Sequence, residues 1–195
     1  MKKALILIIC AASGIASASN LVVNGDFSAD HYTAGSWDEI STLTGWSVIG
    51  NDMAGIGVGY LGAPNQEIDL SGGHDQGGTG ISQLLATTAG QQYSLSFDVY
   101  TGGGYGYPGG VDAFLNGNQI ATDLQGLTGS NASADRQLYT YNFTATGNST
   151  DLMFMDNHGV VSHVGNVSVQ AVPEPSSFLA LGLPLLVLAR RRNKK

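Results

Sequence analysis

The sequence predicts an all-β fold, an antiparallel β-sandwich of the jelly-roll type that occupies residues 19–172. Glycine makes up 28 of the 195 residues, about twice its usual share, and glycine weakens helices. About ten short segments alternate apolar and polar residues and are separated by turn-rich stretches, which is typical of sandwiches. No segment shows a convincing amphipathic helical pattern, so a helical bundle is excluded.

The strands are predicted from this period-two alternation, which is clearest at Gln92–Val99. A hairpin is predicted around Asn116-Gly117, because this dipeptide favours the positive φ angles of a tight turn. The expected strands are, in chain order, Asn20–Val23, Gly45–Ile49, Ile56–Leu61, Gln66–Leu70, Gly80–Leu85, Gln92–Val99, Val111–Leu115, Gln119–Thr122, Gln137–Thr144, Asp151–Met155 and Asn166–Val172.

Residues 1–18 have the pattern of a signal peptide. Lys2 and Lys3 precede an apolar stretch, and Ala16 and Ala18 form a small-x-small cleavage site. We therefore expect export through the Sec translocon and cleavage by signal peptidase before Ser19. Lipidation of Cys10 is the weaker alternative, because the small residues expected before a lipidated cysteine are absent. Removal of Cys10, the one cysteine, leaves a chain without disulfides or thiolate metal ligands.

Residues 173–195 have the pattern of a membrane-directed tail. Pro173-Glu174-Pro175 precedes a short apolar helix at Phe178–Ala189, which is followed by Arg190, Arg191 and Arg192. That helix spans only about 18 Å of a roughly 30 Å hydrocarbon core, so it predicts a weak transmembrane anchor. The cations after it predict that this end stays in the cytoplasm and the body lies outside.

This order of features closely resembles the PEP-CTERM sorting signal of Gram-negative bacteria. The resemblance implies recognition by an exosortase, transient anchoring in the inner membrane, removal of the tail, and delivery to the outer surface or the extracellular matrix. The same signal occurs on some ice-binding proteins, so it specifies an address and not an activity. The alternative interpretation is an ordinary tail anchor.

The charge distribution limits the ligands of the domain. Residues 19–172 contain one basic residue, Arg136, against 14 acidic residues. Such a surface repels phosphate backbones, because nucleic-acid binding depends on Lys and Arg replacing counterions. DNA and RNA are therefore excluded as partners, while cations and neutral sugars remain.

A second resemblance covers nearly all of residues 20–170. In order, the fragments Asn20–Phe27, Gly45–Val48, Gly80–Asp98, Tyr139–Thr146 and Asn166–Val169 resemble the galactose-binding-like β-sandwich domains called choice-of-anchor C, which are often coupled to PEP-CTERM tails. Related jelly rolls include many carbohydrate-binding modules. The resemblance therefore implies an extracellular role in binding sugars or matrix.

No cofactor or metal is expected, although relatives of this kind hold a structural Ca²⁺ with two carboxylates. This chain has Ser28 and Gly165 at those positions, and Ca²⁺ requires six to eight oxygen ligands in which carboxylates are prominent. Asp26 is a possible substitute ligand. We therefore expect the domain to fold without metal.

Three residues are the candidates for ligand binding. Tyr105 and Tyr107 lie in the glycine-rich loop 101–110, and Trp37 is assigned to a polar loop, whereas Trp46 is assigned to the core. Aromatic rings in loops can stack on sugar faces, and Tyr hydroxyls can form hydrogen bonds to them. The alternative for the tyrosines is a merely structural loop.

No catalytic constellation stands out, so we do not expect an enzyme. The leading hypothesis is a non-catalytic module that binds exopolysaccharide. The alternatives are a purely structural biofilm or envelope protein and, less favoured, a secreted carbohydrate-active enzyme that uses paired carboxylates. Ice binding is disfavoured because the chain lacks a regular Thr-rich repeat.

Overall fold

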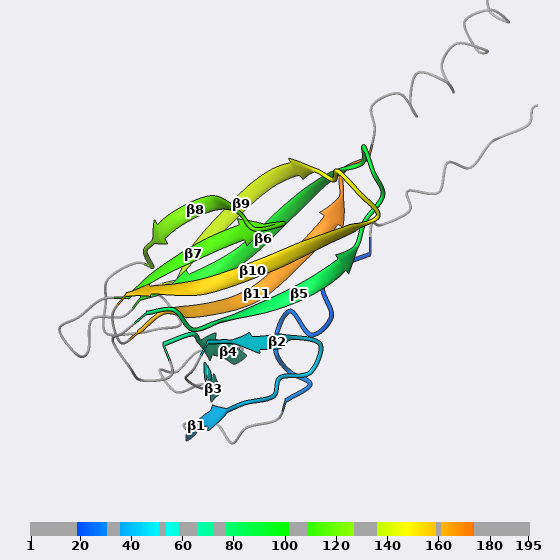
Figure 1. Ribbon diagram of the computed structural model, residues 1–195. Coiled ribbons are helices and arrows are strands. Elements are labelled where there is room, and N and C mark those ends of the chain that lie inside the picture. The colour runs from blue at the N-terminus through cyan, green and yellow to red at the C-terminus, as the bar shows by residue number, and fades with distance from the viewer. Residues whose placement is uncertain are drawn as a thin grey trace, which may run out of the picture.

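The computed structural model describes residues 19–30, 36–50, 54–58, 66–71, 77–101, 109–126, 136–158 and 161–173, of which 36–39, 54–58 and 66 are described by their backbone alone. In these ranges, antiparallel strands form two sheets that stack face to face (Figure 1). The predicted antiparallel β-sandwich is confirmed. None of the described residues belongs to a helix long and apolar enough to cross a membrane. The predicted signal peptide, the apolar helix and the arginines of the tail lie outside the described residues.

The larger sheet has six strands in the order β1-β3-β4-β11-β6-β9, and the smaller has five in the order β2-β5-β10-β7-β8. The strands are β1 (Ser36–Ile40), β2 (Ser47–Ile49), β3 (Ala54–Val58), β4 (Gln66–Asp69), β5 (Gly80–Ala86), β6 (Gln92–Tyr100), β7 (Gly110–Leu115), β8 (Asn118–Leu124), β9 (Gln137–Thr144), β10 (Ser149–His158) and β11 (His163–Ala171).

The hydrophobic core lies between the two sheets. In β6 the buried positions alternate with half-exposed ones, as the period of a strand requires. Phe97 of β6 meets Phe154 of β10 edge-on with ring centroids 4.7 Å apart, which joins the sheets. Trp46 is buried beside Phe154 and Phe27, so its assignment to the core is confirmed.

The predicted hairpin is confirmed in its turn and its strands. Asn116 and Gly117 join β7 to β8 with φ angles of 51° and 73°, which are the positive values that such a turn requires. The Asn116 side chain also accepts a hydrogen bond from the backbone N–H of Asp151 at 2.9 Å. The hairpin is therefore tied to the neighbouring strand β10.

Two predictions about the N-terminal part are wrong. Residues 20–23, expected as a strand, lead into a turn instead, because side chains satisfy the backbone there: Asn20 Oδ1 accepts from Val22 N at 3.1 Å, and Gln83 bonds both the N–H and the carbonyl of Val23. Trp37, expected in a loop, belongs to β1. Alternation did not reveal β1 because the segment is short and has a run of two acidic residues.

Ser28 and Gly165, which stand where carboxylates were expected in related domains, lie in the N-terminal turn and in β11. Ser28 Oγ donates to Asp26 Oδ1 at 2.9 Å, and Gly165 lies within β11. Asp30 instead ties the turn to the chain near β2, accepting bonds from Asn24 Nδ2 at 2.8 Å and from Thr44 Oγ1 at 2.8 Å. In the described part of the chain, no three His, Asp or Glu side chains are grouped as metal ligands.

Candidate functional site: the outer face of the six-stranded sheet

The strand register aligns two rows of residues across the larger sheet, and in β4, β6 and β11 the members of these rows alternate with core residues such as Ile68, Val99 and Val164. In antiparallel sheets, directly paired residues share a face, so the rows follow from the strand register. The first row, in sheet order, is Trp37, Gly57, Glu67, Gly165, Asp98 and Leu138; the second is Glu39, Gly55, Asp69, His163 and Tyr100. The register therefore brings Trp37 of β1 into line with the acidic residues of β4 and β6.

Glycine recurs within these rows. β3 supplies Gly55 and Gly57, and β11 supplies Gly165. β3 lies between β1 and β4, and both of its residues in these rows are glycines. The two neighbouring strands are two strand spacings apart, or about 10 Å. In the first row, the residue paired with Trp37 is therefore a glycine.

A buried ion pair lies in the middle of the first row. Arg136 Nη2 is 2.8 Å from Glu67 Oε2, and the two side chains are only 10% and 2% exposed. Asp98 lies farther from this guanidinium, at 4.0 Å from Nη1, is 19% exposed, and accepts a 2.7 Å hydrogen bond from Asn166 Nδ2. The one basic residue of the domain is therefore used to balance buried acid rather than to meet a ligand.

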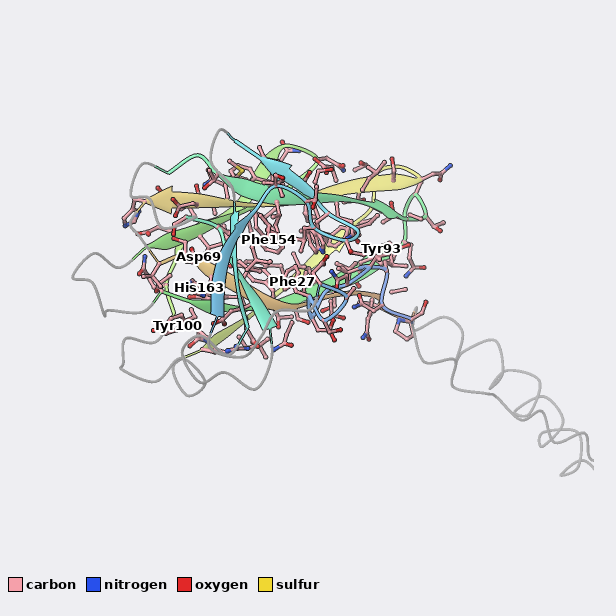
Figure 2. All side chains as sticks on the ribbon, turned by 90° about the horizontal axis from the view of Figure 1, so that it is seen from below. Phe27, Asp69, Tyr93, Tyr100, Phe154 and His163 are labelled. Carbon is pink, nitrogen blue, oxygen red and sulfur yellow. The ribbon has the colours of Figure 1, made fainter. Side chains whose placement is uncertain are left out.

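His163 is buried between two carboxylates. Its Nδ1 is 3.3 Å from Glu67 Oε1 and its Nε2 is 3.7 Å from Asp69 Oδ2, while the ring of Tyr100 packs edge-on against it. Burial lowers the pKa of His163, but Asp69 and Glu67 together raise it more, so that the pKa lies above its ordinary value. Figure 2 shows Asp69, His163 and Tyr100 gathered at one end of the sandwich, away from Tyr93.

The accessible part of this face lies beside the buried cluster. Asp98 and Asn166 are half-buried, whereas Leu138 is 60% exposed. Glu67, Asp69, Arg136 and His163 are too deeply buried to touch a large ligand directly. They hold β4, β11, β6 and the start of β9 in register, and so position the more exposed residues.

The loop with Tyr105 and Tyr107 starts and ends at this same end of the sandwich. Residues 102–108 lie outside the described residues, but the flanking Thr101 and Gly109 are both buried. Thr101 Oγ1 accepts a 2.7 Å hydrogen bond from Gly126 N and donates to Gln125 Oε1 at 3.3 Å. Because Thr101 follows Tyr100 of the second row, the loop begins beside the buried cluster.

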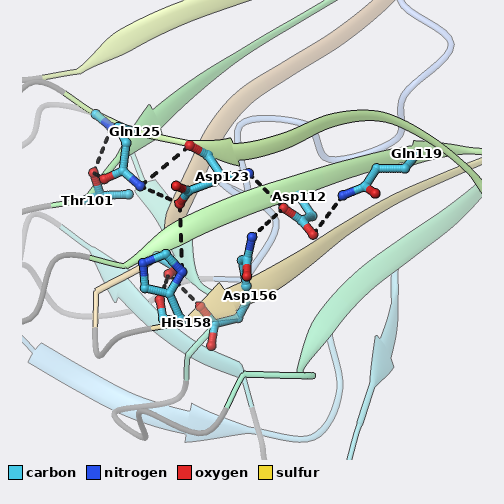
Figure 3. Close-up of polar contacts among 10 residues, drawn as sticks. Thr101, Asp112, Gln119, Asp123, Gln125, Asp156 and His158 are labelled. Atoms are coloured by element: carbon cyan, nitrogen blue, oxygen red, sulfur yellow. Dashed lines mark hydrogen bonds and ion pairs between the residues drawn. The ribbon is translucent and has the colours of Figure 1, made fainter.

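A second polar cluster supports the same end from the smaller sheet (Figure 3). Asp112 accepts hydrogen bonds from Gln119 Nε2 at 2.9 Å, from Asp123 N at 2.8 Å and from Asn157 Nδ2 at 3.0 Å. Gln125 Nε2 donates to Asp123 Oδ1 at 2.6 Å. Since Gln125 also contacts Thr101, this cluster reaches the base of the tyrosine loop.

Asp156 is a buried carboxyl between the two clusters. Its Oδ1 accepts a 2.6 Å hydrogen bond from Ser162 Oγ, and its buried Oδ2 has no hydrogen-bond partner among the described residues. Burial raises the pKa of Asp156 to about 6. The hydrogen bond from Ser162 lowers this pKa, whereas the negative charge of Asp69 raises it further. No sequence pattern pointed to either cluster, because their members come from strands far apart in the chain.

The comparisons with known proteins concern the fold. No family model matches the sequence, and no curated protein matches it. The CBM22-1 xylan-binding domain from Paenibacillus barcinonensis Xyn10C is similar with a TM-score of 0.49 and 12% identity, over 73% of this chain and 96% of that domain. The enzymatically active domain of tailspike protein 4 from bacteriophage CBA120 is similar with a TM-score of 0.48 and 14% identity. The match covers 78% of this chain and 21% of the tailspike chain.

A β-glucosidase from Kluyveromyces marxianus, in complex with glucose, gives a TM-score of 0.36 and 13% identity, over 55% of this chain. This chain thus spans only 12% of the β-glucosidase and about a fifth of the tailspike domain. At these identities and TM-scores, the similarities assign neither a family nor a ligand. Function is therefore inferred from the residues of the site.

Proposed function

We propose that residues 19–172 form a non-catalytic carbohydrate-binding module whose ligand is an extracellular polysaccharide, bound on the outer face of the six-stranded sheet. The observation that carries this proposal is the first row of that face. Its register aligns Trp37 with Gly57 and with Asp98 and Leu138. A tryptophan in line with glycine and with hydrogen-bonding residues suits the apolar faces and hydroxyls of a sugar chain.

The tyrosine loop fits the same proposal. Tyr105 and Tyr107 belong to the segment that begins directly after Tyr100 of the second row, where Thr101 is held by a hydrogen bond from Gly126 N. The excess of acidic residues in the domain favours a neutral or cationic polysaccharide over one rich in uronic acids. The galactose-binding-like, choice-of-anchor C resemblance supports this role as a sequence-based prediction.

Affinity electrophoresis through gels that contain single polysaccharides tests the proposal. We expect retardation by at least one neutral or amino-sugar polymer. Because each aromatic contact contributes about 1 kcal/mol, binding should be about fivefold weaker for Trp37→Ala and about thirtyfold weaker for Tyr105→Ala combined with Tyr107→Ala. Phe114→Ala, on the outer face of the smaller sheet, is the matched control and should bind like the wild type.

Each outcome of this experiment has a distinct meaning. If no polymer retards the protein, the structural biofilm or envelope role replaces the binding role. If binding occurs but is weakened by Phe114→Ala and not by Trp37→Ala, the ligand binds to the five-stranded sheet and the proposed site is wrong. Release of oligosaccharides from a bound polymer would instead favour the carbohydrate-active enzyme.

The termini determine where this module acts. We propose that the Sec translocon and signal peptidase export the chain, that an exosortase recognises Pro173-Glu174-Pro175, and that the processed protein reaches the outer surface or the matrix. The support is the order of the motif, the apolar segment and the arginines in the sequence. A polysaccharide ligand is consistent with that destination.

A further inference from the structure

The four strands at the margins of the two sheets differ in how they resist pairing with another strand. Exposed strand edges invite intermolecular pairing, and proteins guard them with short length, charge or bulges. β2 has three residues. β1 has five, of which Asp38 and Glu39 are acidic. β8 is interrupted by two register shifts against β7, and Asp123 within it has a φ of 50°.

β9, the remaining strand at a sheet margin, has none of these features that prevent edge pairing. It pairs with β6 over eight residues without a register shift, from Thr144 opposite Gln92 to Gln137 opposite Val99. It contains no charged residue and no proline. Its residues alternate between half-exposed and exposed, and none is buried. Among the described strands, β9 pairs only with β6, so its other edge has no strand beside it (Figure 1).

The inward-facing residues of β9 are aromatic, and pairing with a further strand would bury more of their apolar surface. Tyr139, Tyr141 and Phe143 stack on the core aromatics Phe97 and Tyr93, and each is half-exposed. Tyr139 Oη also donates to Gln125 O at 2.7 Å, and no described strand lies beyond β9 in its sheet. A further strand at this margin would cover the exposed parts of the three rings. Such burial is favourable in proportion to the apolar area removed from water.

We propose that β9 is a dimerisation edge, at which a second copy of this chain pairs antiparallel with β9 around Tyr141 and joins the two larger sheets into one. An antiparallel pair of identical strands is related by a twofold axis, which makes the edge complementary to itself. Centring the pair on Tyr141 places Tyr139 of each copy opposite Phe143 of the other and keeps every side chain on its own face.

Charge explains why this edge suits a second copy. Two domains with 14 acidic residues and one basic residue each repel one another. β9 brings no charge to the contact, whereas β1 carries Asp38 and Glu39 and β8 carries Asp123. An eight-residue edge gives a small interface, so the dimer is of the reversible class.

The twofold axis stands perpendicular to the joined sheet, so the outer faces of both copies point to the same side. Leu138 of each copy would lie opposite Thr144 of the other, which makes the two outer faces continuous, and a long polymer could contact both copies at once. The proposed edge does not depend on the sugar-binding proposal, and its test uses no ligand.

Sedimentation velocity of the purified protein over about a hundredfold range of concentration tests the dimer. We expect the wild type to pass from monomer to dimer, and Thr140→Lys combined with Asn142→Lys to stay monomeric, because lysines guard edges. Both positions are exposed. Asn118→Lys with Thr122→Lys, at exposed positions of the bulged edge β8, adds the same charge and should dimerise like the wild type.

Three results would overturn the proposal: a wild type that stays monomeric throughout, a Thr140/Asn142 variant that dimerises like the wild type, or equal loss of the dimer in both lysine pairs. Hydrogen exchange of the wild type gives a measurement that needs no variant. Amides of β9 should become more protected as the concentration rises, and amides of β8 should not.

Discussion

Buried ionisable residues at one end of the sandwich make stability depend on pH. Asp156 has its pKa raised to about 6 by burial, and the pKa of buried His163 is raised by its two carboxylate neighbours against the effect of burial. A group with a raised folded-state pKa contributes most stability at low pH and loses that contribution as the pH rises through the folded value. The contribution of Asp156 to stability is lost between about pH 4 and pH 6. The contribution of His163 is lost as the pH rises above 6.5, its ordinary pKa.

Replacing Asp156 with Asn should therefore change the pH profile of stability. The variant lacks the cost of ionising a buried carboxyl, so its free energy of unfolding relative to the wild type should rise from pH 4 to pH 6 and then level off, by roughly 3 kcal/mol at most. Urea unfolding at several pH values measures this difference. A difference that is constant over the range would show that Asp156 does not titrate there.

The Arg136–Glu67 pair should be costly to break from one side. Arg136→Met leaves the Glu67 carboxylate buried without its cation, which should reduce the free energy of unfolding by about 3–5 kcal/mol. Glu67→Gln combined with Arg136→Met removes both charges and should recover most of that loss. If the double variant is as unstable as the single one, the loss comes from packing and not from the unpaired charge.

At the scale of elements, turns and close contacts fix how strands meet. Gly25 accepts a hydrogen bond from Val167 N at 2.8 Å and lies so close to β11 that a Cβ there would overlap the Val167 carbonyl oxygen. At Gly117 of the β7–β8 turn, a Cβ would have no atom within 4 Å, and only the φ of 73° favours glycine. The two glycines are therefore required for different reasons.

Gly25→Ala and Gly117→Ala should separate these reasons. Gly117→Ala should cost about 1 kcal/mol, since the penalty is conformational alone. Gly25→Ala should cost clearly more, because the N-terminal turn has to move away from β11. Thermal unfolding of both variants gives the comparison, and equal melting temperatures would mean that the turn around Gly25 yields without strain.

At the scale of the whole molecule, side chains hold the N-terminal segment to the sandwich. Asn20 Oδ1 accepts from Val169 N at 2.8 Å, and Gln83 Nε2 donates to Val23 O at 2.9 Å. These bonds connect the segment to both sheets.

Chelation should accordingly leave the fold unchanged. We expect EDTA to shift the melting temperature by less than about 2 °C, and a drop of more than about 5 °C, equivalent to roughly 1–2 kcal/mol, would demonstrate a stabilising metal. Addition of Ca²⁺ after chelation is the control for a metal removed during purification.

Sorting is predicted to depend on the motif at the C-terminal boundary. Replacing Pro173, Glu174 and Pro175 with alanine should leave export intact, because the N-terminal signal is unchanged, but should prevent removal of the tail. The unprocessed protein should then remain in the inner-membrane fraction, whereas the wild type should be shorter and reach the surface or the medium. Immunoblots of the fractions measure both; wild-type processing of the alanine variant would contradict the exosortase proposal.

The all-β class, most of the strands and the hairpin turn at Asn116-Gly117 could be predicted from the sequence alone, because alternation and turn chemistry are local properties. The charge balance and the predicted roles of the termini also come from the sequence. That residues 20–23 lead into a turn, and that Trp37 lies in a strand aligned with Glu67 and Asp98, became evident only from the three-dimensional structure. The physical reason is register: it pairs residues separated by many positions in the chain, and no local pattern specifies which strand becomes the neighbour of another.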